Sequence, residues 1–135
     1  MHFIFDENLS HRLAEGLSLL ESGDLSSPIT KISHMNQLLE DGASDQEVIQ
    51  EAGKTNAIII SQDDDFKRIR SHKALIKSLG VGYVMYRPPK RGSSYWDIVQ
   101  AFIQGWPEIK NTLKEKKTPF LFQIDKNGKL AEIDL

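Results

Sequence analysis

The run Ala57-Ile58-Ile59-Ile60 constrains the fold of this chain more than any other feature of its sequence. Its residues are apolar without alternation, and β-branched isoleucine dominates them, which is typical of a strand buried on both faces of a parallel sheet. Two further apolar runs, Phe3-Ile4-Phe5 and residues 80–86, have the same character. Segments with apolar residues at helical spacing separate the runs. This alternation predicts right-handed crossovers and an α/β fold with a central, mainly parallel sheet.

The other elements can be placed from apolar spacing and from turn residues. We expect helices over residues 9–22, 44–52, 66–79 and 95–113, and a less distinct strand over residues 28–32. The last helix would present one apolar stripe that runs from Tyr95 through Ile103 to Leu113. Residues 119–135 are predicted to form a β-hairpin with Asn127-Gly128 at its turn. The hairpin would elaborate a single domain over residues 1–135.

Composition excludes several functional classes. The chain has 135 residues, no cysteine and a formal net charge of −2. Without cysteine there is no disulfide framework and no thiolate zinc site. No apolar run approaches the roughly 20 residues that span a bilayer, and an acid follows the first apolar run too early for a signal peptide. We therefore expect a cytoplasmic protein with no membrane partner, and one that does not coat nucleic acid non-specifically.

Acidic residues follow both of the apolar strands closely. Phe3-Ile4-Phe5 runs directly into Asp6, and the run that ends at Ile60 reaches Asp63 after two polar residues. A third acid, Asp45, lies at the start of the helix that follows Gly42. In open α/β sheets, binding sites form outside the carboxyl ends of the strands. The sequence therefore predicts a shared acidic site at that edge.

Carboxylates that converge in this way need a compensating positive charge. Two unit charges about 4 Å apart repel by about 4 kcal/mol at an effective dielectric near 20. A divalent cation is the simplest solution, because Mg²⁺ and Mn²⁺ favour carboxylate and water ligands. Raised pKa values, or a nearby arginine such as Arg12, are the alternatives. The four histidines show no metal-ligand spacing, so we expect them to be surface or hydrogen-bonded residues.

Helix capping explains some of these acids without any catalytic role. Ser44 and Glu47 have the spacing of a capping box. Asp45 would also stabilise the dipole of the same helix, and Asp65 could cap the helix that starts after it. Asp6 and Asp63, which follow the two strands, lack such a structural explanation.

Three segments together carry the pattern of a known family. They are Phe5-Asp6-Glu7-Asn8-Leu9 with Arg12-Leu13, Gly42-Ala43-Ser44-Asp45-Gln46-Glu47-Val48-Ile49, and Ile58-Ile59-Ile60-Ser61-Gln62-Asp63-Asp64-Asp65-Phe66. In this order and at this spacing they resemble the PIN-like proteins of the DUF5615 group, which are related to the Mut7-C ribonuclease domain and to VapC-type PIN toxins. The resemblance covers about the first half of the chain. It implies a PIN-like three-layer fold and a metal-dependent nuclease that acts chiefly on RNA.

The resemblance also implies roles for individual residues. Asp6 matches the acid that ends the first strand, Asp45 the acid that opens the later helix, and Asp63 the acid of a motif in which Ser61 holds the hydroxyl position. Asp65 matches a further acid of the group. The implied catalytic residues are thus Asp6, Asp45, Asp63 and Asp65, and the implied ligands of Mg²⁺ or Mn²⁺ are Asp6, Asp45 and Asp63. Supporting roles are expected for Glu7, Asn8, Arg12, Glu47 and Ser61.

One acid of the family pattern has no clear counterpart. PIN toxins usually carry a glutamate on a middle helix, and the connection before Gly42 is short here. Glu47 or the pair Glu40-Asp41 are the candidates for a substitute. Full catalytic competence depends on which of them, if any, fills this role.

Basic residues near the predicted site would contact RNA. The helix after the third acidic segment and the loop after Tyr86 both begin at carboxyl ends of strands, and Tyr95 and Trp96 follow that loop with rings suited to stacking on unpaired bases. A solvated helix face is the structural alternative. The candidate RNA-binding residues are Lys67, Arg68, Arg70, Arg87, Lys90 and Arg91.

Three functions compete at this level. The first is a metal-dependent endoribonuclease, which could be the toxin of a toxin–antitoxin pair and would then have RNA as substrate and an antitoxin protein as partner. The second is a catalytically weak PIN-like module that binds nucleic acid or protein. A phospho-receiver domain is disfavoured, because Arg87-Pro88 stands where it would need a lysine. A homodimer is compatible with each of these functions.

Overall fold

The computed structural model describes residues 1–62, 66–88 and 92–135 of the chain. Six strands and six helices are assigned in this part of the sequence. In chain order they are β1 (His2–Phe5), α1 (His11–Ser22), β2 (Lys31–His34), α2 (Met35–Leu38), α3 (Asp45–Thr55), β3 (Ala57–Gln62), α4 (Phe66–Arg70), α5 (Lys73–Leu79), β4 (Gly82–Tyr86), α6 (Tyr95–Leu113), β5 (Phe120–Ile124) and β6 (Leu130–Ile133).

One sheet contains all six strands, in the order β2-β1-β3-β4-β5-β6. Strands β1 to β5 pair in parallel, and only β6 runs antiparallel, against β5. The predicted α/β fold with a mainly parallel sheet and a C-terminal hairpin is confirmed. The hairpin also extends the sheet, because β5 pairs directly with β4.

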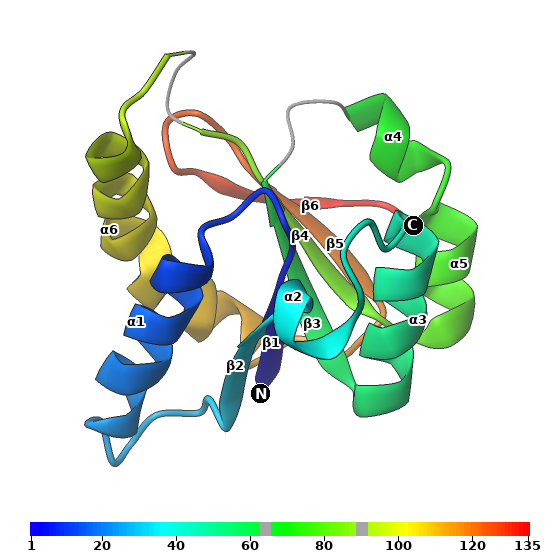
Figure 1. Cartoon of the computed structure of the whole chain (residues 1–135). Coiled ribbons are helices and arrows are strands. Elements are labelled where there is room, and N and C mark those ends of the chain that lie inside the picture. Colours follow the sequence, from blue (N-terminus) through cyan, green and yellow to red (C-terminus); the bar gives the residue numbers. More distant parts are fainter. Residues whose placement is uncertain (63–65, 89–91) are drawn as a thin grey trace.

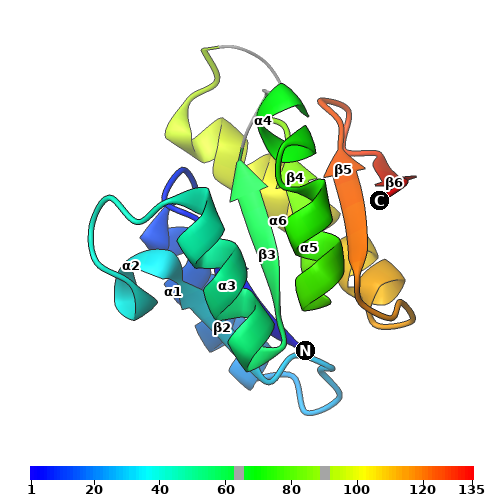
Figure 2. The ribbon, with the colours of Figure 1, turned by 90° about the vertical axis from the view of Figure 1, so that its right-hand side faces the viewer.

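Helices cover both faces of the sheet, which gives three layers (Figures 1 and 2). Helices α1 and α6 lie on one face, and α3, α4 and α5 lie on the other. The isoleucine run of β3 serves both layers: Ile58 and Ile60 pack towards α1 and α6, whereas Ile59 packs towards α3 and α5. A strand with both faces buried has no solvent side, and this explains the lack of polar alternation in its sequence.

Several predicted boundaries were wrong. The second strand begins at Lys31 and not at residue 28, because Pro28 has no N–H to donate to the ladder and pairing starts with His2 opposite Lys31. The helix predicted over residues 66–79 is two helices, separated by a turn in which the His72 N–H bonds to the Ile69 carbonyl at 3.0 Å. Within α6, Tyr95 and Ile103 are 49% and 43% exposed and do not join the buried stripe.

The carboxyl ends of the five parallel strands share one edge of the sheet, which is the upper edge in Figure 1. Asp6, Gln62, Arg87 and Asp125 therefore end or follow neighbouring strands there. The hairpin turn also lies at this edge, where Gly128 has φ +80° and the Asp125 carboxylate accepts from the Asn127 and Lys129 N–H groups at 2.9 Å. Among the described residues, no helix is both long and apolar enough to cross a bilayer.

Candidate functional site

Asp6 is the buried polar residue at the carboxyl end of β1. Its own N–H continues the ladder to the Ile60 carbonyl on β3 at 3.0 Å, and its side chain is 8% exposed. The carboxylate accepts a short hydrogen bond from the Ser61 hydroxyl, and its Oδ1 accepts from the N–H groups of Asn8 at 3.1 Å and Gln62 at 3.5 Å. The parallel pairing of β1 with β3 is thus what brings Ser61 to Asp6.

Burial raises the pKa of Asp6 to about 6. Desolvation is the largest cause, the hydrogen bond from Ser61 and those from the backbone oppose it, and the charge of Asp45 adds to the rise. A carboxyl group that titrates this close to neutral pH can exchange its proton for a bound cation. Perturbation of this kind is common at functional sites.

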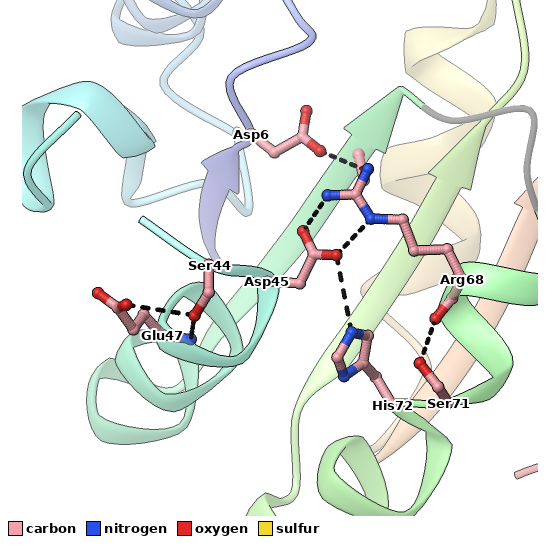
Figure 3. Close-up of polar contacts among 8 residues, drawn as sticks. Asp6, Ser44, Asp45, Glu47, Arg68, Ser71 and His72 are labelled. Carbon is pink, nitrogen blue, oxygen red and sulfur yellow. Dashed lines mark hydrogen bonds and ion pairs between the residues drawn. The ribbon is translucent and has the colours of Figure 1, made fainter. Parts of the chain in front are cut away.

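Asp45, at the first position of α3, is held by an arginine (Figure 3). Arg68 of α4 donates from Nε to Oδ2 at 2.5 Å and from an Nη to Oδ1 at 2.8 Å, which is the two-pronged geometry of a guanidinium–carboxylate pair. His72 Nε2 lies 3.6 Å from the same Oδ2. Arg68 therefore supplies positive charge to Asp45, a part that the sequence suggested for Arg12.

The two acids line one small pocket at the carboxyl edge. Its walls include Asp6, Glu7, Asp45 and the buried side chain of Tyr83, and its volume is about 10 Å³. A volume of that size holds about one water molecule. Asp6 and Asp45, 39 positions apart in the sequence, are therefore the two predicted ligands that the described structure brings together.

Most of the supporting residues lie at the surface. Glu47 is exposed and accepts from the Ser44 hydroxyl at 3.2 Å, while its N–H donates to the same hydroxyl, so its contacts are those of helix capping. Asn8 and Arg12 are exposed and contribute backbone N–H groups, to Asp6 and to the Ser10 cap respectively. Ser61 is the predicted supporting residue with a side-chain bond to Asp6.

Two predicted catalytic residues, Asp63 and Asp65, lie outside the described residues. Within residues 1–62, 66–88 and 92–135, no three histidine, aspartate or glutamate side chains gather closely enough to hold a metal ion. Glu40 and Asp41, the candidates for the remaining family acid, are exposed in the connection between α2 and α3. The described structure therefore brings two of the predicted metal ligands, Asp6 and Asp45, to this site.

The candidate RNA-binding residues divide into three groups. Lys67 and Arg70 are exposed on α4, beside Arg68, whose side chain is 47% exposed although it pairs with Asp45. Arg87 is exposed directly after β4. The other two, Lys90 and Arg91, lie outside the described residues. Basic side chains thus stand at the same edge as the acids, on α4 and directly after β4.

A groove of about 480 Å³ lies between the start of α1 and the start of α6, and Glu7, the residue after Asp6, lines it. Asn8, Gln62 and Tyr95 line it together with His11 and His34. Trp96, which is 74% exposed, stands next to it with its ring centroid 5.8 Å from that of Tyr95. The groove is therefore lined both by Glu7, the residue after Asp6, and by Tyr95.

The histidines divide into structural and site residues. His34 is buried, donates from Nε2 to the Leu9 carbonyl at 2.7 Å and accepts at Nδ1 from the Asn36 N–H at 3.2 Å, as expected of a hydrogen-bonded histidine. His72 was not predicted as a site residue, yet it lies beside Asp45. Helical spacing could not have found it, because α4 ends at Arg70 and His72 is the residue before α5.

Comparison with known protein families matches residues 1–87 to a family described as "PIN like domain". The matched segment runs from β1 to the residue after β4 and includes Asp6, Asp45 and Arg68. No curated protein and no solved structure matches the chain.

Proposed function

Because this chain belongs to the PIN-like domain family, we propose that it is a metal-dependent endoribonuclease that hydrolyses RNA phosphodiester bonds. The observation that carries the proposal is the meeting of Asp6 and Asp45 at the carboxyl edge of the sheet. Asp6 is buried and titrates near pH 6, and Asp45 is paired with a cationic side chain. Both features are those of carboxylates that require positive charge.

The two carboxylates suit a magnesium or manganese ion. Mg²⁺ usually keeps several water ligands and is bound through one or two carboxylates together with substrate phosphates. Asp6 and Asp45 would supply these carboxylates, and Asp63 would be the third ligand that the family pattern implies. When bound, such an ion lowers the pKa of a water molecule and stabilises negative charge on a phosphate.

The surrounding residues would prepare the carboxylates for this role. Ser61 and the backbone N–H groups of Asn8 and Gln62 fix the orientation of the Asp6 carboxylate and favour its ionised form. Above about pH 7 most molecules would carry Asp6 ionised. Arg68 would change partner, because a guanidinium fork binds phosphate oxygens as well as carboxylates.

RNA would lie along the groove that is lined by Glu7 and Tyr95. An unpaired strand is the substrate that fits, since exposed tyrosine and tryptophan rings stack on bases without regard to sequence. Arg87 and the basic residues of α4 would hold the phosphates. A role as the toxin of a toxin–antitoxin pair is a further part of the proposal, and it implies an antitoxin partner.

Cleavage of labelled single-stranded RNA in the presence of Mn²⁺ tests the proposal. The native protein should cleave, and Asp6→Asn and Asp45→Asn should each lower the rate at least 100-fold, since ligand loss removes the charge that holds the ion. Asp24→Asn is the matched control, because Asp24 is an exposed acid after α1, at the opposite edge of the sheet. Cleavage that survives in both site variants would contradict the assignment.

One observation favours a second function, that of a binding module with little catalytic power. The Arg68–Asp45 pair already neutralises one of the two predicted metal ligands that the structure describes. A module of this kind would bind RNA with the same affinity in native protein and in Asp6→Asn, and would cleave with neither. Filter binding and the cleavage assay on the same samples separate the two functions.

A further inference from the structure

Arg68 occupies both carboxylate oxygens of Asp45, one of the predicted metal ligands (Figure 3). Its Nε lies 2.5 Å from Oδ2, and an Nη lies 2.8 Å from Oδ1. Asp45 also lines the pocket that Asp6 lines, so a metal ion bound by the two acids would stand close to the guanidinium. Like charges at such a separation repel each other. Arg68 and the ion are therefore alternative partners of Asp45.

The ion pair is too exposed to serve mainly as a structural link. The side chains of Arg68 and Asp45 are 47% and 29% exposed, and exposed pairs contribute little to stability because water and salt screen them. Helix α4 has another anchor, since Ile69 is 4% exposed and belongs to the apolar cluster between the sheet and helices α3 and α5. The Arg68 side chain can therefore change partner while the helix keeps its place.

Helix α4 presents Arg68 among other cations that suit phosphates. Lys67 and Arg70 are exposed on the same five-residue helix, which follows the carboxyl end of β3. Positive side chains of this kind attract a nucleic-acid backbone whatever its sequence. A guanidinium fork matches phosphate oxygens as well as it matches a carboxylate. An RNA strand at this edge would thus offer Arg68 a second partner of the same geometry.

Transfer of Arg68 to a phosphate would change the charge at the pocket. Asp45 would lose its cationic partner, and its charge already contributes to the raised pKa of Asp6. The two carboxylates and the nearby phosphate would then repel one another. A divalent cation relieves this repulsion, because Mg²⁺ is usually bound by one or two carboxylates together with substrate phosphates. RNA binding would therefore raise the affinity of the site for the ion.

We propose that Arg68 exchanges between Asp45 and a backbone phosphate of single-stranded RNA, so that RNA and the metal ion bind cooperatively. The inference rests on the proposed function and adds a regulation of that site by its own substrate. The pair with Arg68 keeps the affinity of Asp45 for the ion low until a phosphate takes the guanidinium. By thermodynamic linkage, the ion strengthens RNA binding by the same factor as RNA strengthens binding of the ion.

Isothermal titration with MnCl₂ at pH 7.5, with and without a saturating oligonucleotide, measures the cooperativity. The probe is a single-stranded 2′-O-methyl phosphorothioate oligoribonucleotide, checked on a gel to be intact after each titration. Titration of MnCl₂ into the probe alone corrects for ions that its phosphates hold. The coupling factor is the Mn²⁺ dissociation constant without the probe divided by that with it. It should be about 2- to 5-fold larger in the native protein than in Arg68→Gln.

Two further variants separate the exchange of Arg68 from general effects of charge. Arg70→Gln removes the same charge from the same helix and should keep the native coupling factor, even though it binds the probe less tightly. Arg68→Lys keeps the charge but lacks the fork that holds both oxygens, so its coupling factor should fall below the native one. Circular dichroism checks that each variant folds.

A double-mutant cycle in EDTA tests the same exchange through RNA binding alone. Asp45→Asn should tighten binding of the probe, because Arg68 loses its competing partner and the strand loses a repelling charge. The second effect persists in the Arg68→Gln background, whereas the first is absent there. The gain in affinity from Asp45→Asn should therefore be about 2- to 5-fold smaller in that background.

Equal coupling factors in the native protein and Arg68→Gln would overturn the inference, as would a loss of coupling in Arg70→Gln as large as that in Arg68→Gln. A gain from Asp45→Asn that is the same in both backgrounds would also overturn it. A native protein that binds neither Mn²⁺ nor the probe contradicts this inference and the proposed function together. A protein that cleaves RNA with equal coupling factors contradicts this inference alone, and one that shows the expected coupling but never cleaves contradicts only the proposed function.

Discussion

Arg68 holds both oxygens of the Asp45 carboxylate, at 2.5 and 2.8 Å, although the two residues lie 23 positions apart in the sequence. The side chains are 47% and 29% exposed, so water screens the pair and its contribution to stability is about 1 kcal/mol or less. A weak ion pair of this kind can be displaced. The guanidinium and the proposed metal ion would therefore compete for the same carboxylate.

Arg68→Gln should tighten Mn²⁺ binding. Loss of a competing interaction of up to about 1 kcal/mol corresponds to a gain in affinity of up to about 5-fold. Isothermal titration with MnCl₂ at pH 7.5 measures the effect, and Arg70→Gln, on the same short helix, is the matched control. Weaker Mn²⁺ binding by Arg68→Gln would show that the arginine supports the metal site and does not compete with it.

The sequence alone could not predict which arginine pairs with Asp45. A need for positive charge near the acids followed from the strand ends alone, and Arg12 was the arginine nearest to Asp6 in the sequence. Which residue pairs with Asp45 depends on how α4 lies relative to α3 in the folded structure. The chain passes through β3 between these two helices. Spacing along one helix or strand carries no information on such a contact between elements.

The raised pKa of Asp6 should make the metal-free protein less stable as pH rises from 4 to 6. The carboxyl keeps its proton up to about pH 6 in the folded state but only to 3.8 when unfolded, so the folded state binds more protons in this window. The contribution of Asp6 to the free energy of unfolding is fully present below pH 3.8 and is lost as the pH rises through 6. A shift from 3.8 to about 6 corresponds to roughly 3 kcal/mol in total.

Urea unfolding from pH 4 to 7.5 measures this effect as the difference between the native protein and Asp6→Asn. All other titrating groups are common to both proteins and cancel. The free energy of unfolding of the native protein should fall relative to that of the variant by roughly 3 kcal/mol across the window. Two curves that stay parallel would show that Asp6 titrates near its ordinary pKa.

Ser61→Ala should move the pH dependence of Mn²⁺ binding upward. The Ser61 hydroxyl stabilises the ionised form of Asp6, so its removal raises the pKa of that carboxyl further. A hydrogen bond to a charged group of about 1.5 kcal/mol corresponds to a shift of about one pH unit. Ser33→Ala is the control, because Ser33 is equally buried on β2 but contacts His2. An unchanged pH dependence of Mn²⁺ binding in Ser61→Ala would show that Ser61 does not act on the metal site.

The fold was more predictable than the site. Buried strands have a local signature, as the isoleucine run of β3 shows, because both faces impose the same apolar requirement. Tyr95 shows the limit of that reasoning: its position continues the apolar spacing of α6, but it is the first residue of the helix and is 49% exposed. Whether an apolar spacing leads to burial depends on where the helix ends relative to its neighbours.

Gly82→Ala should destabilise the protein by about 1–3 kcal/mol. A Cβ atom at Gly82 would lie 2.6 Å from Cζ and 2.9 Å from Cε1 of Phe120, and 3.1 Å from a side-chain carbon of Ile58. Phe120 is only 3% exposed, and its ring packs edge-on against that of Phe122, with centroids 5.5 Å apart. Thermal unfolding measures the loss, and Gly16→Ala, at an open helix position, should instead be neutral or stabilising.

Glu21→Ala should cost about 2–4 kcal/mol, although the residue lies far from the proposed active site. Its carboxylate accepts hydrogen bonds from Trp106 Nε1 at 2.8 Å, Lys110 Nζ at 2.7 Å and Ser27 Oγ at 2.6 Å, and so ties α1 to α6.

Truncation would leave a buried indole N–H and a largely buried ammonium group, 17% exposed, without their acceptor. Urea unfolding measures the loss, with Glu15→Ala, an exposed acid on the same helix, as the control. A change of less than 1 kcal/mol would mean that water replaces the carboxylate. RNA cleavage by folded Glu21→Ala protein should match that of the native protein, because the network acts on stability and not on the Asp6 site.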